Sequence, residues 1–115
     1  PQAIGLLSRV ANQVSSPAHK FRARLAIAKA CIRMQVFDIA RAQLEALERV
    51  ADEHRLQAWD PELCAEMYAN LYRARKAQSV LVMDDGELTK KVAQSLERLT
   101  ELDAAQALAV MQESP

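Results

Sequence analysis

Residues 37–54 have the sequence FDIARAQLEALERVADEH, and this stretch decides the fold class. Its apolar residues recur three and four positions apart, at Phe37, Ala40, Leu44, Leu47 and Ala51. This spacing places them on one face of an α-helix, as expected for a helix packed nearly antiparallel to a neighbour. Most of the other positions are charged or polar. The stretch therefore predicts an amphipathic helix that lies against another helix.

The composition of the whole chain is typical of an all-α protein. Of its 115 residues, 21 are alanine and 14 are leucine, whereas glycine contributes two and the aromatic residues five. Alanine and leucine are strong helix formers, while sheets favour the β-branched and aromatic residues that are scarce here. We expect one helical domain over residues 1–115, with about six helices packed as antiparallel hairpins. This arrangement is similar to a helical-repeat array, although no clean repeat period is present.

Three polar residues are placed to cap helices. Ser16 and Asp60 each precede a proline, which fits the first position of a helix because its missing N–H is not needed there. Asp103 is followed three positions later by Gln106, as in a modified capping box. The expected helices cover about residues 2–14, 17–34, 37–54 and 61–78, then a fifth from residue 85 or 86, and a short last helix from residue 103.

The charges balance over the chain but not along it. Fifteen Lys and Arg residues equal fifteen Asp and Glu residues, whereas a nucleic-acid-binding protein usually has a basic excess. The expected helix over 17–34 is basic with no acidic residue, and the next helix is acidic. Because a short turn should make these helices a hairpin, we interpret the basic residues as partners of the acidic helix. The alternative is a nucleic-acid-binding surface made of Lys20, Arg22, Arg24, Lys29 and Arg33.

Catalytic and metal-binding motifs are missing from the sequence. It has no CxxC, HExxH, GxSxG or phosphate-binding glycine loop, and His19 and His54 have no partner at metal-ligand spacing. We therefore expect no enzyme activity, no cofactor and no metal. No apolar stretch approaches the ~20 residues that cross a bilayer. Cys31 and Cys64 are expected to be buried, reduced thiols of a cytoplasmic protein.

The acidic residues of the 37–54 helix have a structural interpretation. Glu45, Glu48, Asp52 and Glu53 fall opposite or beside the leucine seam, and Glu45 can pair with Arg49 one turn later. They are expected to form a solvated helix surface with this stabilising pair. We do not expect a catalytic carboxylate pair among them.

One distinctive motif lies between two expected helices: His54-x-Leu56-x-x-Trp59-x-Pro61-x-Leu63. A connection of this kind needs a large anchor, so we interpret the motif as a fold anchor in which Trp59 fills the corner between the helices. A partner-binding role for this tryptophan is the alternative.

Two further features suggest contacts with another chain. A tyrosine pair lies one turn apart on the expected 61–78 helix. Such a pair is either at the edge of the core or at an interface, where tyrosine is enriched. Four consecutive apolar residues follow that helix, and they either cover the domain's own core or are exposed to a second subunit. The candidate self-association residues are Tyr68, Tyr72, Val80, Leu81, Val82 and Met83.

Residues 19–75 resemble a known family. FRARLA at 21–26, HRLQAWDPEL at 54–63 and the following Leu71–Tyr72 are similar to the C-terminal domain of the TssA (ImpA/VasJ-like) proteins of bacterial type VI secretion systems. In that family a helical hairpin precedes a stretch like His-x-Leu-x-x-Trp-x-Pro-x-Leu. This chain departs from the pattern at the hairpin turn, where Gln35 and Val36 stand in place of an expected glycine.

The resemblance implies a non-enzymatic, cytoplasmic assembly protein. Its C-terminal domain would form large symmetric rings, and it would act at the baseplate, sheath and inner tube of a contractile, phage-tail-like machine. We expect this chain to be the C-terminal oligomerisation domain of a longer protein. Its expected partners are further copies of itself and the baseplate, sheath and inner-tube proteins, with no nucleic acid and no membrane insertion. The alternative is a monomeric helical-repeat adaptor that binds a partner peptide in a groove.

Overall fold

The computed structural model describes residues 16–82 and 86–113, which form six α-helices and no strand. The expected helix over residues 2–14 lies outside the described residues. The all-α prediction is confirmed. The helices are α2 (Pro17–Arg33), α3 (Phe37–Glu53), α4 (Leu56–Trp59), α5 (Pro61–Leu81), α6 (Glu87–Leu102) and α7 (Ala104–Met111).

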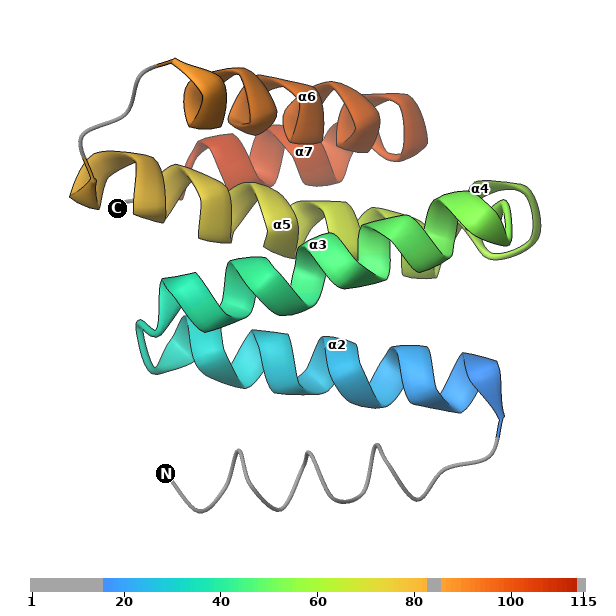
Figure 1. The fold of residues 1–115 in the computed structure, drawn as a ribbon. Coiled ribbons are helices and arrows are strands. Elements are labelled where there is room, and N and C mark those ends of the chain that lie inside the picture. Colours follow the sequence, from blue (N-terminus) through green and yellow to red (C-terminus); the bar gives the residue numbers. More distant parts are fainter. Residues whose placement is uncertain (1–15, 83–85, 114–115) are drawn as a thin grey trace.

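Helix α5 is the centre of the bundle. The α2–α3 hairpin packs on one side of it and the α6–α7 hairpin on the other, with α4 linking α3 to α5 at one end (Figure 1). Each long helix runs antiparallel to the one before it, as predicted. The core therefore collects apolar side chains from both hairpins and from several sides of α5. Its largest fully buried apolar side chains are Leu44, Leu47, Met67, Leu71, Leu99 and Val110.

The three predicted helix caps are confirmed. In each, the side-chain oxygen accepts the backbone N–H three positions later, which satisfies a donor that the helix itself leaves free. These bonds join Ser16 to His19 at 3.5 Å, Asp60 to Leu63 at 3.2 Å, and Asp103 to Gln106 at 3.0 Å.

The turn between α2 and α3 closes without glycine. Gln35 adopts a left-handed conformation, with φ of 61°. Its N–H donates to the Ile32 carbonyl at 3.0 Å, and the Val36 N–H donates to the Cys31 carbonyl at 2.8 Å. These two bonds form a Schellman motif, whose left-handed position is usually glycine. The expected hairpin is confirmed, and a glutamine holds the strained position.

Helix α5 is longer than the sequence predicts. It continues past residue 78 to Leu81, and the chain becomes extended at Val82. The predicted end is wrong because no proline or glycine interrupts the chain before Gly86. That glycine has φ of 101° and precedes α6. The extension carries Val80 and Leu81 one further turn along the α5 axis.

Candidate interaction surfaces

Trp59 lies at the corner between α3 and α5, but it is not buried. Its side chain is 56% exposed, and its indole Nε1–H donates to the His54 carbonyl at 2.7 Å. The buried anchor is Leu56, which is 3% exposed. The interpretation of Trp59 as the filling of the corner is therefore corrected. After Arg55, which has φ of 50°, the chain makes the single helical turn α4, and this turn points Leu56 into the core.

The rest of the motif divides between core and surface. Leu63 is 7% exposed and joins Leu56 in the core, whereas His54 and Pro61 are exposed. The leucines of the motif therefore anchor the fold, and its ring-bearing residues remain on the surface.

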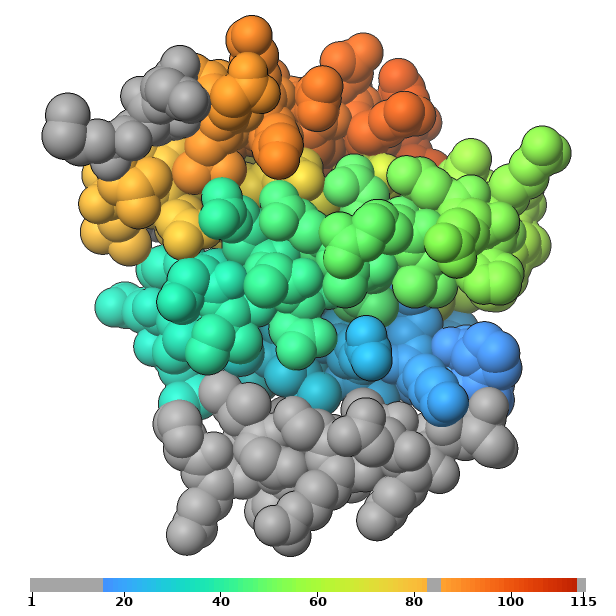
Figure 2. Space-filling view, viewed as in Figure 1, coloured from blue at the N-terminus to red at the C-terminus, as the bar shows by residue number. Residues whose placement is uncertain are grey.

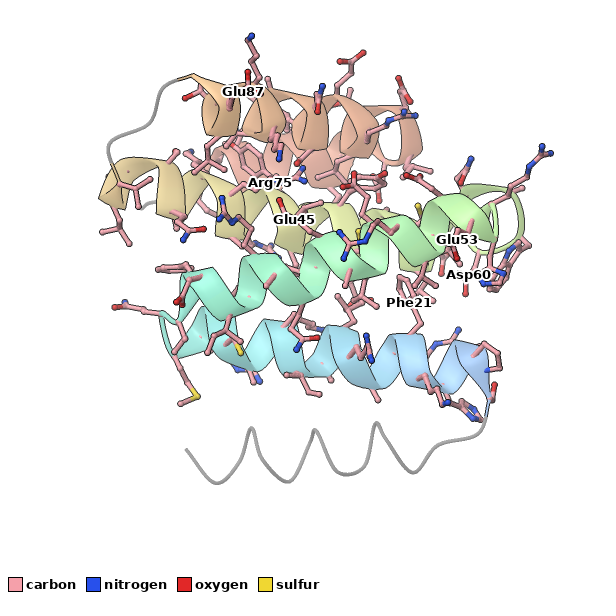
Figure 3. All side chains as sticks on the ribbon, viewed as in Figure 1. Phe21, Glu45, Glu53, Asp60, Arg75 and Glu87 are labelled. Carbon is pink, nitrogen blue, oxygen red and sulfur yellow. The ribbon has the colours of Figure 1, made fainter. Side chains whose placement is uncertain are left out.

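An apolar pocket of about 140 Å³ opens beside Trp59. It lies where the first turn of α2, the last turn of α3 and α4 meet, at the end of the molecule where Figure 3 labels Phe21, Glu53 and Asp60. Its lining is almost entirely apolar, which suits an apolar group more than a charged one. The lining residues are Pro17, Ala18, Phe21, Val50, Ala51, His54, Leu56, Trp59 and Leu63.

The opposite end of α5 exposes three consecutive apolar residues. Val80 is 75% exposed, Leu81 71% and Val82 47%, and we call these three the α5-end segment. Figure 2 shows the C-terminal part of α5 reaching the edge of the molecule. The sequence left open whether this stretch covers the core or faces outward, and these three residues face outward. Met83, the fourth candidate, lies outside the described residues.

The two tyrosines predicted for self-association lie in the chain's own core. Tyr68 is 5% exposed and Tyr72 6%. Burial raises the pKa of the Tyr68 hydroxyl well above its usual value. The candidate role is corrected because α5 is covered on several sides, so positions that would be at the edge of an outer helix are inside. The accessible part of the predicted self-association set is the α5-end segment.

Arg75 of α5 is a buried cation that connects three helices. Its side chain is 6% exposed. On α3, its Nη2 lies 3.1 Å from Glu45 Oε2 and 3.3 Å from Glu48 Oε1. Towards α6, its Nη1–H groups donate to Ser95 Oγ at 2.7 Å and to the Lys91 carbonyl at 3.3 Å. Figure 3 shows Arg75 and Glu45 facing each other between α5 and α3.

This cluster overturns two electrostatic predictions. Glu45 and Glu48 are not a fully solvated surface, since each side chain is only about a quarter exposed, at 25% and 26%. Glu45 pairs with Arg75, so the predicted pairing with Arg49 is wrong. The sequence offered no clear signal for this cluster, because Arg75 lies in a run of basic and polar residues with Arg73 and Lys76.

The basic residues of α2 also pair differently from the prediction. In the described part of the chain, Arg22 bonds to Asp60 at 3.1 Å and Lys29 to Glu66 at 2.7 Å. Both acids belong to the cap or the body of α5 rather than to α3. The prediction that α2 complements the acidic α3 helix is wrong because α5 lies beside both helices and presents its own carboxylates to α2.

Both cysteines are free and buried, as predicted. Burial raises the pKa of the Cys64 thiol to about 11 and also raises that of Cys31. Among the residues that the structure describes, no group of three or more His, Cys, Asp or Glu side chains could hold a metal ion. Over those same ranges, no helix combines the length and apolarity needed to cross a membrane.

A type VI secretion family model, described by the names EvfE, EvfF, ImpA, BimE, VC_A0119 and VasJ, matches residues 1–71, more than half of the chain. The chain belongs to the ImpA/VasJ family of type VI secretion. The resemblance seen in the sequence to TssA (ImpA/VasJ-like) proteins is thereby confirmed. No curated protein and no solved structure matches the chain.

The family match covers one of the two candidate interaction surfaces of this ImpA/VasJ-family chain and not the other. It contains α2, α3, α4 and the first half of α5, and so it includes every residue that lines the Trp59 pocket. It ends at Leu71, before Arg75, the α5-end segment and the α6–α7 hairpin. The pocket is thus a feature of the matched region, whereas the α5-end segment lies beyond it.

Proposed function

We propose that this chain is a non-enzymatic structural component of the type VI secretion apparatus that assembles with copies of itself into a closed ring. The ring would belong to the cytoplasmic machinery that builds the baseplate and the tail sheath and tube. Membership of the ImpA/VasJ family supports the link to type VI secretion. The observation that best supports self-association is the exposure of the α5-end segment, in which Val80 and Leu81 are more than two-thirds exposed.

Burying the α5-end segment against another copy contributes favourably to the free energy of association. Fully burying a valine or leucine side chain is worth about 1.5–3 kcal/mol, so three side chains exposed by half to three-quarters offer roughly 3–5 kcal/mol per contact. Association costs at least about 4 kcal/mol in lost translational and rotational freedom, so the segment supplies part of the required free energy and other contacts between neighbouring copies would supply the rest. A formal net charge of zero adds no long-range repulsion between copies. In a closed ring each copy makes two such contacts, which stabilises the assembly further.

A ring also gives this small domain a mode of action. Each copy would present its remaining surfaces in a symmetric array towards the baseplate, sheath and inner-tube proteins. Such an array raises the effective concentration of weak binding sites without adding new chemistry. The domain would therefore act as an oligomerisation and display unit.

The experiment is the solution mass of the 115-residue chain, measured by light scattering after size exclusion over a range of concentrations. A discrete mass several times 12.8 kDa that persists on dilution is expected. Leu81→Asp should return the mass to 12.8 kDa while the helical circular-dichroism signal is retained. The matched control is Leu108→Asp on α7, where the leucine is 57% exposed, and it should leave the mass unchanged.

A second function is favoured by the pocket beside Trp59. A monomeric adaptor could hold an apolar side chain of a partner peptide there, as helical-repeat proteins do in their grooves. A wild-type chain that is a 12.8 kDa monomer at every concentration would contradict the ring and favour this adaptor. Loss of helicity in Leu81→Asp would show instead that Leu81 supports the fold.

A further inference from the structure

We propose that the α5-end segment of one copy docks in the Trp59 pocket of the next copy, with Leu81 as the inserted side chain. The contact between neighbours would then be head to tail. This inference rests on the proposed self-association and adds the two surfaces that meet.

The size of the pocket fits the side chain that would enter it. The pocket has a volume of about 140 Å³ and an almost wholly apolar lining. An apolar cavity of about 150 Å³ in another protein holds a benzene molecule, which has six heavy atoms. The leucine side chain has four, so it is small enough for the volume of this pocket. Docking would also cover the ring of Trp59, which is 56% exposed in the single chain.

The two surfaces lie at opposite ends of the same helix. Leu63, in the first turn of α5, lines the pocket, and Leu81 is the last residue of α5. A helix of 21 residues is about 30 Å long at 1.5 Å per residue, so the segment cannot reach its own pocket. Figure 1 shows these two ends on opposite sides of the molecule. Two complementary surfaces placed this way produce a heterologous contact, the kind that closes into rings.

Charge favours the same pairing. The last turn of α5 has no basic side chain, so its negative helix pole is not neutralised from within the helix. The first turn of α2, which forms one wall of the pocket, has no acidic side chain and carries the exposed Lys20. The acidic Asp52 and Glu53 belong to the α3 wall, so the favourable approach of an incoming α5 end is over α2.

The same helix poles disfavour the symmetric arrangement. If two α5-end segments packed against each other, two negative helix ends would meet with no basic residue in either last turn. An isologous contact through this segment alone would also leave both Trp59 pockets empty. Head-to-tail docking keeps the two negative helix ends apart, and it fills the Trp59 pocket of each copy that receives a neighbour.

The test mixes two variants that each keep one of the two surfaces. Leu81→Asp keeps the pocket and Trp59, whereas Trp59→Lys keeps the α5-end segment and removes the single tryptophan of the chain. Titrating Trp59→Lys into Leu81→Asp should shift the tryptophan emission to shorter wavelength. At about 1 mM of each variant, where a single contact of ~4 kcal/mol is substantially occupied, sedimentation should show a one-to-one complex of twice 12.8 kDa. The control is the double variant Trp59→Lys/Leu81→Asp, which has neither surface and should cause no shift.

The outcomes separate this inference from the proposed function. If the wild-type chain assembles but the mixture stays monomeric and its emission does not move, head-to-tail docking is wrong and the ring uses other surfaces. If the wild-type chain is monomeric throughout, the proposed ring fails and the docking fails with it. Should Trp59→Lys lose helicity, Trp59→Phe/Val50→Lys replaces it, since Val50 lines the pocket and is already 37% exposed.

Discussion

Replacing Arg75 by methionine tests whether the buried ion cluster stabilises the domain. Methionine keeps much of the apolar stem and removes the guanidinium group. Glu45 and Glu48 then lose their shared cation, while Ser95 keeps its bond to the Lys91 carbonyl at 2.8 Å. The perturbation is therefore concentrated on the α3 side of the cluster, where the two carboxylates are left together.

The expected cost follows from the geometry. Removing one partner of a buried ion pair costs about 3–5 kcal/mol when the other charge stays buried. Here the carboxylates of Glu45 and Glu48 keep about a quarter of their surface in water, so they can regain part of their hydration. We expect Arg75→Met to lower the free energy of unfolding by about 2–3 kcal/mol, a large share of the ~5–15 kcal/mol typical of a domain.

The assay is urea unfolding followed by circular dichroism at several protein concentrations, so that any contribution from assembly is recognised by its concentration dependence. The matched control is Arg73→Met, because Arg73 is 35% exposed and its pair with Glu113 lies at the surface. An exposed pair of this kind contributes at most about 1 kcal/mol.

A double-mutant cycle isolates the interaction between the two helices. Arg75→Met, Glu45→Gln and the double variant should show a coupling energy of about 1–2 kcal/mol, because these side chains are in direct contact. Additive effects, or an Arg75→Met variant as stable as the wild type, would refute the reasoning. The cluster would then be replaceable by apolar packing, as some buried ion pairs are.

Two further predictions concern the backbone and the buried thiols. Gln35→Gly should raise the free energy of unfolding by about 0.5–1 kcal/mol, because glycine adopts the left-handed conformation at φ of 61° without the penalty of a Cβ; a lower urea midpoint would contradict this. For Cys64, burial raises the thiol pKa from 9.0 to about 11, so the stabilisation is fully present below pH 9 and is lost as the pH rises towards 11. At 1.36 kcal/mol per pKa unit the full loss is about 3 kcal/mol, of which roughly 2 kcal/mol is reached by pH 11. In urea melts, Cys64→Ala should show a smaller fall in the free energy of unfolding between pH 9 and 11. Equal falls would show that the thiol has the same pKa in the folded and unfolded states.

Local chemistry explains what the sequence predicted well. Ser16, Asp60 and Asp103 cap helices through bonds that span three residues, so their roles depend on their immediate neighbours. The α2–α3 hairpin is also determined locally, because a short turn joins two stretches whose residues favour helices. The motif at residues 54–63 also carried enough information to indicate the family. These features need no knowledge of how the helices are stacked.

The errors arise where a residue's environment depends on a distant helix. Glu45 meets Arg75 across 30 positions, and Ser95 meets it across 20, so no spacing within one helix could indicate the cluster. Tyr68 and Tyr72 are buried for the same reason, since α5 is covered by a hairpin on each side.

The sequence alone determined the helical class, the starts of the longer helices and the family, because propensity, capping and motif spacing act over a few residues; it did not predict the short helix α4. Only the tertiary structure decided that Leu56 rather than Trp59 is buried, that Arg75 joins three helices, and that the α5-end segment is exposed. Burial and ion pairing depend on which surfaces meet when α5 is enclosed between two hairpins. Those contacts are set by the packing of the whole bundle.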